Sequence, residues 1–353
     1  MSGIKPLLRW NRENKMSTST VKKRLTTSAM IASIAAEGQP TEAAPFGHAL
    51  VELARQRQDI VGLTADLSKY TDLHLFADAF PDRFFQMGMA EQLLMSAAAG
   101  MAREGFTPFV TTYAVFASRR AYDFICMAIA EENLNVKIAC ALPGLTTGYG
   151  PSHQATEDLA IFRGMPNLTI IDPCDSREIS QVVPAIADHQ GPVYMRLLRG
   201  KVPLVLDKYD YRYQHGKAQR LRSGKHAVII SSGLMTMRAL EAAEQLESHG
   251  IEVGVVHSPV IKPLDEATIL REAGEAVSAG RLVITAENHS ITGGLGEAIA
   301  ATLLRHGVTP RFRQIALPDA FLAAGALPTL HDRYGISTQA MVTQITAWLE
   351  HGA

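Results

Sequence analysis

The 353-residue chain is poor in cysteine and contains no long uninterrupted run of apolar residues. Its three cysteines, Cys126, Cys140 and Cys174, lie far apart and form no CxxC or Cys/His metal-binding spacing. We therefore expect reduced core cysteines in a cytoplasmic protein and no metal ligands in this chain. Since a membrane helix needs about 18 or more consecutive apolar residues, and no such run occurs, we expect no membrane span.

The chain also has little net charge and lacks several catalytic motifs. Its formal net charge is -1, its pI is near 6.9 and its basic residues are spread along the sequence, so we expect no nucleic-acid partner. Nucleophile-elbow, HExxH, EF-hand and GxxxxGK[ST] patterns are absent. The glycine-rich turn at residues 292–298 is not a GxGxxG motif, and tight helix packing explains it at least as well.

Residues 1–40 differ in composition from the rest of the chain. They contain seven Lys or Arg residues but only Glu13 and Glu37 as acids, with frequent Ser and Thr. This composition fits an organellar transit peptide, but a flexible leader with Met16 or Met30 as an alternative start is the simpler interpretation. We therefore predict a flexible leader over 1–40.

The remaining sequence alternates between helix-like and strand-like segments, and 47% hydrophobic content supports two sizeable cores. Predicted helices cover 47–58, 90–105, 118–133, 153–165 and 176–190, and predicted strands cover 59–66, 106–113, 135–142, 168–173 and 191–198. After a polar, turn-rich stretch the second half repeats the alternation, with helices at 236–250, 264–280, 293–307 and 337–351 and strands at 226–233, 251–260, 281–288 and 311–319. Continuously apolar strands between helices predict mostly parallel sheets covered on both faces.

This pattern predicts an α/β protein with two three-layer α/β/α domains. The first domain is expected at 41–206, a linker at 207–224 and the second domain at 225–353. In such sheets, function gathers in loops beyond the carboxyl ends of the strands.

Three features of the first domain are candidates for chemistry. Glu91 begins a predicted helix, where an acid interacts favourably with the helix dipole, but its apolar neighbours could also bury it and so raise its pKa if something covers them. Tyr113 and Phe116 follow a strand and could stack against a flat heterocycle. His153 lies in a glycine-rich loop and could act as an acid, a base or a hydrogen-bond donor. A helix-start acid, a core aromatic pair and a packing histidine are the structural alternatives.

Taken together, these motifs resemble a known family. The segments MGMAEQ, TTYAVF followed by RAYD, and GLTTGYGPSHQATEDLAIFRGMPNLTIIDPCD closely resemble the pyrimidine-binding domain of the transketolase family. The segments IKPLD and ENHSITGGLGEA resemble its C-terminal domain. The resemblance covers about residues 45–350.

The resemblance implies thiamine diphosphate as the cofactor. By this resemblance Glu91 would hydrogen-bond N1′ of the aminopyrimidine and promote removal of the thiazolium C2 proton. Phe116 would stack on the pyrimidine with Tyr113 beside it, and Asp66 matches a family acid near the cofactor. Met89, two residues before Glu91 in MGMAEQ, is a further expected cofactor contact.

The resemblance also implies a sugar phosphate substrate. His153 matches the histidine beside the reacting carbon, and Arg199 falls where the family commonly places a substrate-phosphate arginine, although Arg196 is close by. The family's Glu-Asp-Gly before SHQ is replaced here by a shorter segment that contains Tyr149, and an upstream phosphate-binding histidine is absent. These departures argue against standard xylulose or ribose 5-phosphate and favour an unusual ketose phosphate, such as the apulose 4-phosphate of a related transketolase type.

A family motif is missing as well. The family's diphosphate-binding domain carries GDG and a later Asn, which hold Mg²⁺ and the diphosphate, and no GDG occurs in this chain. The chain therefore resembles the C-terminal subunit of a split transketolase, which requires an N-terminal partner subunit, with α2β2 as the expected assembly. The alternatives are a 2-oxo acid dehydrogenase E1 β subunit, a full 1-deoxyxylulose-phosphate synthase, which would need its own diphosphate domain, and a non-catalytic scaffold.

Overall fold

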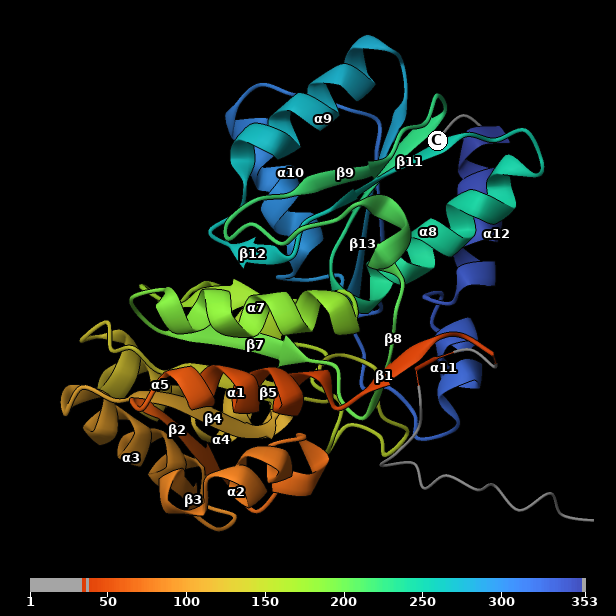
Figure 1. Ribbon diagram of the computed structural model, residues 1–353. Helices are drawn as coiled ribbons and strands as arrows, with labels where there is room; N and C mark the ends of the chain where they lie inside the picture. Colours follow the sequence, from red (N-terminus) through yellow and green to blue (C-terminus); the bar gives the residue numbers. More distant parts are fainter. Residues whose placement is uncertain (1–33, 36–37, 351–353) are drawn as a thin grey trace, which may run out of the picture.

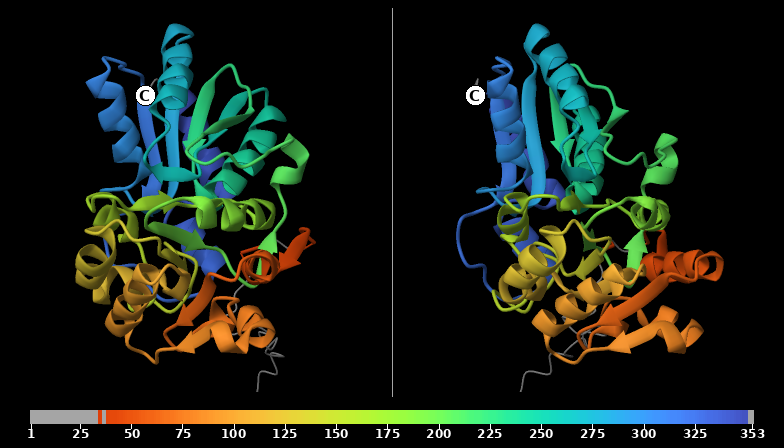
Figure 2. Two further views of the ribbon diagram at one scale, coloured as in Figure 1. Left: turned by 60° about the vertical axis from the view of Figure 1, so that its left-hand side comes forward. Right: turned by 90° about the vertical axis from the view of Figure 1, so that its left-hand side faces the viewer.

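The computed structural model describes residues 34–35 and 38–350 and shows two α/β domains stacked on each other (Figure 1). The expected leader at 1–40 lies almost wholly outside the described residues. In further views the second domain again stands above the first, with α7 and β7 at the boundary between them (Figure 2). No helix in the described part of the chain is both long and apolar enough to span a membrane.

A seven-stranded sheet forms the centre of the first domain, in the order β12-β6-β7-β5-β4-β2-β3. All strands from this domain run parallel, whereas β12 comes from the second domain and pairs antiparallel with β6. The strands are β2 (Ile60–Thr64), β3 (Phe84–Gln86), β4 (Thr107–Tyr113), β5 (Lys137–Ala141), β6 (Thr169–Ile171), β7 (Val193–Leu197) and β12 (Val260–Lys262). Strands β2, β4, β5, β6 and β7 are buried throughout, as expected for a parallel sheet covered on both faces.

Helices cover both faces of this sheet. One apolar cluster joins the sheet to α1 (Pro45–Gln56), α2 (His74–Ala79) and α7 (Ser176–Asp188), and a second joins it to α3 (Glu91–Arg103), α5 (Tyr122–Ile125) and α6 (Asp158–Arg163). Helix α4 (Ala114–Arg120) precedes α5, and a π-helical turn at Cys126–Ala130 follows it. Short 3₁₀ turns lie at Ser68–Tyr70, Pro81–Arg83 and Leu206–Tyr209.

The second domain contains a five-stranded sheet in the order β14-β13-β10-β11-β9. Its strands are β9 (Gln219–Arg222), β10 (Ala227–Ser231), β11 (Val253–His257), β13 (Leu282–Ser290) and β14 (Phe312–Leu317), and only β9 is antiparallel to its neighbour. Its helices are α8 (Gly233–Glu247), α9 (Glu266–Ser278), α10 (Leu295–Arg305), α11 (Leu327–Arg333) and α12 (Thr338–Glu350). A two-stranded ribbon of β1 (Thr41–Ala43) and β8 (Lys201–Pro203) lies beside the first domain (Figure 1). The predicted α/β class with two covered, mostly parallel sheets is confirmed.

Three predicted segments differ from the structure. The segment expected to be a linker at 207–224 contains β9, whose half-exposed edge position explains its polar composition. The helix predicted at 153–165 begins only at Asp158, because Ala155 forms β-bridges to Pro143 and Gly144 and holds the preceding residues in turns. The helix predicted at 118–133 begins earlier, at Ala114, and is interrupted at Ala121.

The glycine-rich turn at 292–298 binds the side chain of Glu287 in β13. Burial raises the pKa of Glu287 to about 7, although its side chain accepts hydrogen bonds from the backbone N–H groups of Gly296 (2.8 Å) and Leu295 (2.6 Å). A Cβ on Gly294 would collide with the Glu287 carboxylate, so only glycine leaves room for this contact.

A buried ion pair of the first domain makes hydrogen bonds to the second domain. The Arg196 guanidinium donates to both carboxylate oxygens of Asp158 (2.9 and 3.0 Å), to Asp172 (3.1 Å) and to the backbone carbonyl of Asn288 in the second domain (2.9 Å). Burial opposes the charge of Arg196, but Asp158 and Asp172 raise its pKa above the ordinary value. Asp172 also accepts from Ser232 in the second domain (2.8 Å), so Arg196 and Asp172 connect the first domain to the second.

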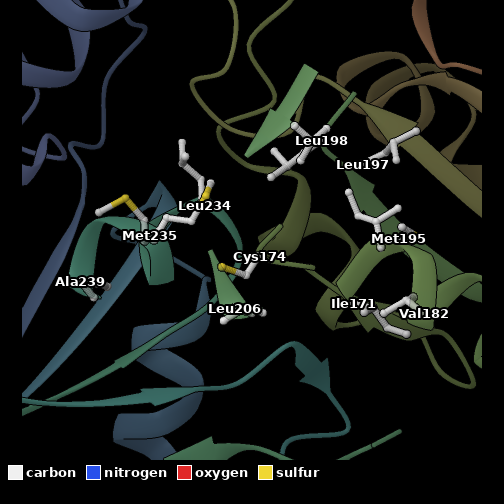
Figure 3. Close-up of a cluster of buried hydrophobic side chains, with 14 of the residues drawn as sticks. Ile171, Cys174, Val182, Met195, Leu197, Leu198, Leu206, Leu234, Met235 and Ala239 are labelled. Carbon is white, nitrogen blue, oxygen red and sulfur yellow. The ribbon is translucent and has the colours of Figure 1, made fainter. Parts of the chain in front are cut away.

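Apolar packing accompanies this ion pair at the domain boundary. Figure 3 shows part of the shared cluster, in which Cys174 of the first domain lies near Leu234 and Met235 of α8. Beside it, the buried Glu178 carboxylate lies 2.9 Å from His257 Nε2 and accepts from the Tyr211 hydroxyl. The three cysteines are unpaired, and Cys140 and Cys174 are buried.

We predict that Arg196→Met destabilises the protein by about 3–5 kcal/mol, because it leaves two buried carboxylates without their cation. Urea unfolding followed by circular dichroism measures the change. Arg103→Met is the matched control, since Arg103 forms a half-exposed pair with Glu132, and a much smaller shift is expected for it. Equal shifts for the two variants would contradict a special role of the buried pair.

Candidate active site

Four aromatic side chains meet at the carboxyl edge of the first sheet. Tyr113 ends β4 and Phe116 lies one turn into α4, with ring centroids 5.6 Å apart. The His153 ring lies 5.6 Å from Phe116, 6.1 Å from Tyr113 and 5.2 Å from Tyr149. Residues that are 40 positions apart in sequence therefore form one cluster.

Several buried polar atoms in this region lack a hydrogen-bond partner within the described part of the chain. They are the Tyr113 hydroxyl, Thr147 Oγ1 and Gln154 Oε1, all in residues that are almost completely buried. Burial also raises the pKa of Tyr113 above its ordinary value. Because buried polar groups are normally paired, such atoms are expected where a water or a ligand completes the structure.

Glu91 begins α3 and is only 3% exposed. Its Oε1 accepts a hydrogen bond from Arg120 Nη1 at 3.1 Å, so the carboxylate has a cationic neighbour. Of the apolar neighbours that the sequence suggested as an enclosure, Leu94 is buried, but Met89 is 81% and Leu93 53% exposed. Within this chain, the Glu91 side chain is therefore paired with a cation, and the exposed apolar groups lie at the surface beside it.

The turn that carries His153 is held by α4. Arg119 donates to the carbonyl of Pro151 (2.8 Å) and pairs with Glu157, and so anchors the turn from both ends. His153 Nδ1 lies 2.9 Å from Ser152 Oγ. Burial, and secondarily the charge of Arg120, lowers the pKa of His153, which favours the neutral imidazole.

The second domain holds the beginning of the same loop. Leu145 N–H donates to Asn288 Oδ1 (2.9 Å), and the Leu145 carbonyl accepts from His331 Nε2 (2.7 Å). His331 Nδ1 faces Arg238 Nη2 at 2.9 Å, and burial, followed by this arginine, lowers the pKa of His331 to about 4. His331 is therefore neutral at physiological pH, with its proton on Nε2 directed at Leu145.

Glycine is required where this loop meets the second domain. Gly144 has a φ of +57°, and a Cβ at this position would come within 2.1 Å of the Asn288 backbone oxygen. Further along, Gly325 N–H donates to the Gly148 carbonyl (3.0 Å), and Gln154 Nε2 donates to the Ala323 carbonyl (3.2 Å). The loop at 142–154 is thus shaped by contacts from both domains.

The structure separates the two arginines that the sequence left as alternatives. Arg196 is buried in its ion pairs with Asp158 and Asp172, whereas Arg199 lies beyond the end of β7 and is half-buried. Burial lowers the pKa of Arg199, and Tyr113, Asp72 and Tyr149 are among the groups that act on it electrostatically. Arg199 therefore lies near the aromatic cluster, and Arg196 has a structural role.

Asp66 and Tyr149 lie at the surface of the same edge. Asp66 is exposed, has a φ of +58° and exchanges hydrogen bonds with the Gln86 side chain through its N–H (2.7 Å) and Oδ1 (3.2 Å). Tyr149 is 38% exposed beside His153. Among the described residues Asp66 pairs with Gln86 and not with the aromatic cluster, so its role stays a prediction.

The sequence did not predict a role in the site for four residues that contact it. Arg119 and Arg120 were visible as neighbours of the aromatic pair, but their partners Glu157 and Glu91 are distant in sequence. Asn288 and His331 belong to the second domain, and only its ENHS segment offered a pattern. In the described residues 34–35 and 38–350, no group of three or more His, Cys, Asp or Glu side chains is arranged to hold a metal ion.

Comparison with known families accounts for this two-domain arrangement. Residues 39–205 match the family described as transketolase, pyrimidine binding domain, and residues 216–341 match transketolase, C-terminal domain. The chain belongs to the transketolase family. A pyrimidine-binding domain of this family implies that thiamine diphosphate is the cofactor.

Similar transketolase-family proteins include chains of nearly the same length. The chain is 72% identical over 328 residues to an uncharacterized transketolase family protein of Sinorhizobium fredii, covering 93% of this chain and 94% of the relative. It is 36% identical to the 6-deoxy-6-sulfo-D-fructose transketolase subunit SqwH of a Clostridium species, covering 83% and 89%. A solved structure described as a split gene transketolase, inactive beta4 tetramer, is 40% identical with a TM-score of 0.78 and covers 87% of this chain and 97% of its own.

We predict that His331→Leu loosens the loop at 142–154 of this transketolase-family chain, because the Leu145 carbonyl loses its donor at a cost of about 1–3 kcal/mol. Hydrogen–deuterium exchange should show faster exchange in peptides from this loop and unchanged exchange in α7. His331→Gln, which retains an N–H donor, should restore part of the protection. The exposed His249 provides the control variant His249→Leu, and unaltered loop exchange in His331→Leu would refute the role assigned to His331.

Proposed function

We propose that this chain is the C-terminal subunit of a split transketolase, which transfers a two-carbon ketol unit from a ketose phosphate to an aldose phosphate. The observation that carries the proposal is the joint placement of Glu91, Phe116, Tyr113 and His153 at one sheet edge of a pyrimidine-binding domain. The sequence contains no GDG motif, so the diphosphate site is assigned to another chain.

The residues present fit the pyrimidine end of thiamine diphosphate. Phe116 offers a flat surface, the buried Tyr113 hydroxyl lacks a partner in the described chain, and Glu91 provides a buried carboxylate. The bound cofactor supplies the carbanion chemistry that breaks and forms the carbon–carbon bond. Glu91 holds the proton at pyrimidine N1′, Phe116 and Tyr113 orient the ring, and Met89 and Asp66 complete the cofactor contacts.

His153 is assigned to the substrate. Its Nδ1 faces Ser152, so Nε2 is the nitrogen that exchanges a proton with a substrate hydroxyl. Its lowered pKa keeps the ring neutral and able to accept that proton at neutral pH. The contacts of Arg119, Asn288 and His331 fix the backbone of the loop that carries this ring.

The substrate carries an anionic group that Arg199 binds. Tyr149 stands beside His153 where standard transketolases place an acid for a substrate hydroxyl, so a non-standard ketose such as apulose 4-phosphate is the proposed donor. The name of the Clostridium relative specifies a sulfonated sugar, which also presents an anion. A donor panel therefore has to include branched and sulfonated ketoses.

The partner is an N-terminal transketolase subunit that carries the diphosphate and Mg²⁺ ligands, in an α2β2 assembly in the cytoplasm. The surface around Glu91 is suited to a partner, because Met89 and Leu93, two residues to either side of it, and Phe124 and Met127, which follow Arg120, are exposed large apolar side chains. The related split-gene chain was solved as an inactive beta4 tetramer, which is consistent with a chain that needs a different subunit for activity.

Two other functions can be distinguished from ketol transfer by experiment. A 2-oxo acid dehydrogenase E1 β subunit would decarboxylate 2-oxo acids with its partner, and a scaffold subunit would catalyse neither reaction. The chain is co-expressed with the adjacently encoded protein, if that protein carries GDG and a later Asn. Assays of ketol transfer and of 2-oxo acid decarboxylation then distinguish the transketolase, the E1 β subunit and the scaffold.

We predict that Glu91→Gln lowers ketol transfer by the reconstituted complex by about 100-fold or more, because the amide cannot hold the N1′ proton. Size-exclusion chromatography should show unchanged assembly. Glu104→Gln, at the exposed end of the same helix, is the control and should retain full activity. Unchanged turnover in Glu91→Gln would exclude the proposed mechanism.

A further inference from the structure

Arg120, the first residue of the RAYD segment, contacts both Glu91 and Phe116. It is the last residue of α4, and its Nη1 donates to Glu91 Oε1 at 3.1 Å. Its Cζ lies 4.0 Å from the centroid of the Phe116 ring, which is the distance of a close cation–π contact. One guanidinium thus binds both residues that are assigned to the cofactor's pyrimidine.

The chemistry of a guanidinium is close to that of the aminopyrimidine. Both are flat, both carry a delocalised N–C–N unit with N–H donors, and both stack on an aromatic face while donating to a carboxylate. The Tyr113 and His153 rings also lie 5.6 Å from the Phe116 centroid, so Arg120 shares this ring with two other side chains. An aminopyrimidine bound to Glu91 and Phe116 would therefore meet Arg120 at the same carboxylate and the same ring.

We propose that Arg120 occupies the pyrimidine subsite in the unpartnered chain and has to leave Glu91 and Phe116 before the cofactor is seated. This inference rests on the proposed function, since it takes Glu91 and Phe116 as cofactor contacts. Arg120 thereby sets the affinity of the free subunit for the cofactor. Arg120 therefore belongs to the cofactor site, and it lowers cofactor affinity by occupying the position of the pyrimidine.

The position of Arg120 allows this exchange. Its side chain is 50% exposed, so its ion pair and its ring contact are both weakened by water and can be broken by a competing ligand. The helix is interrupted at Ala121, directly after Arg120, and the exposed rings of Tyr122 and Phe124 follow. A partner that covers these rings also covers the backbone that carries Arg120, which links docking to the release of Glu91.

The first test is isothermal titration of the isolated full chain with thiamine, which has the aminopyrimidine but no diphosphate. Arg120→Met should bind thiamine about tenfold more tightly than the unmodified chain, equivalent to about 1.4 kcal/mol. Arg103→Met is the matched control, because Arg103 is also 50% exposed and pairs with Glu132 at the other end of α3. It removes the same charge and should leave thiamine affinity unchanged.

The second test is an NMR titration of His153, assigned with a His153→Gln variant. Because the charge of Arg120 contributes, after burial, to the lowered pKa of His153, that pKa should rise in Arg120→Met and stay constant in Arg103→Met. An unchanged His153 titration, or thiamine affinity in Arg120→Met equal to or weaker than that of the unmodified chain, overturns the proposal.

The two proposals fail in different ways. If the complex reconstituted with the partner binds thiamine diphosphate and transfers ketol units, but Arg120→Met gains no affinity, only the role of Arg120 is wrong. If neither the complex nor any variant binds the cofactor or thiamine, the proposed function is wrong, and the Arg120 proposal falls with it.

Discussion

The buried Arg196 guanidinium is the contact on which the arrangement of both domains depends. It neutralises Asp158 and Asp172 and binds the Asn288 carbonyl, and Asn288 in turn holds Leu145 at the start of the His153 loop. Buried ion pairs add little net stability compared with apolar packing, but losing one member leaves an uncompensated charge. The pair therefore acts chiefly to specify how the second domain sits on the first. The position of the His153 loop in the candidate active site depends on that contact, through Asn288.

The second domain is part of the site although it contributes no side chain to the aromatic cluster. Asn288 and His331 satisfy both backbone groups of Leu145, and Arg119 anchors the opposite end of the loop. The other side of the site is a surface, where Met89 and Leu93 project into solvent beside the paired Glu91. The loop at 142–154 is held by the second domain, and the apolar side chains beside Glu91 are exposed. These two features are expected of half of a site that a second chain completes.

Much of the fold followed from the sequence, because buried parallel strands such as β2, β4 and β5 are continuously apolar and are separated by amphipathic helices. The polar edge strand β9 was hidden by its linker-like composition, and the late start of α6 depended on the bridges of Ala155. Glu91, Phe116 and His153 were recognised by motif order, and the structure brings Phe116 and His153 together. The contacts of Arg120 and His331 were not predictable, since they join residues 29 and 186 positions apart.

The central claim is that this chain holds only the pyrimidine half of a thiamine diphosphate site. It is tested most directly by titrating thiamine diphosphate with Mg²⁺ into this chain alone, into its GDG-bearing partner alone and into the equimolar mixture. We expect tight binding by the mixture and weak binding by this chain alone. Tight, Mg²⁺-dependent binding by this chain without a partner would contradict it.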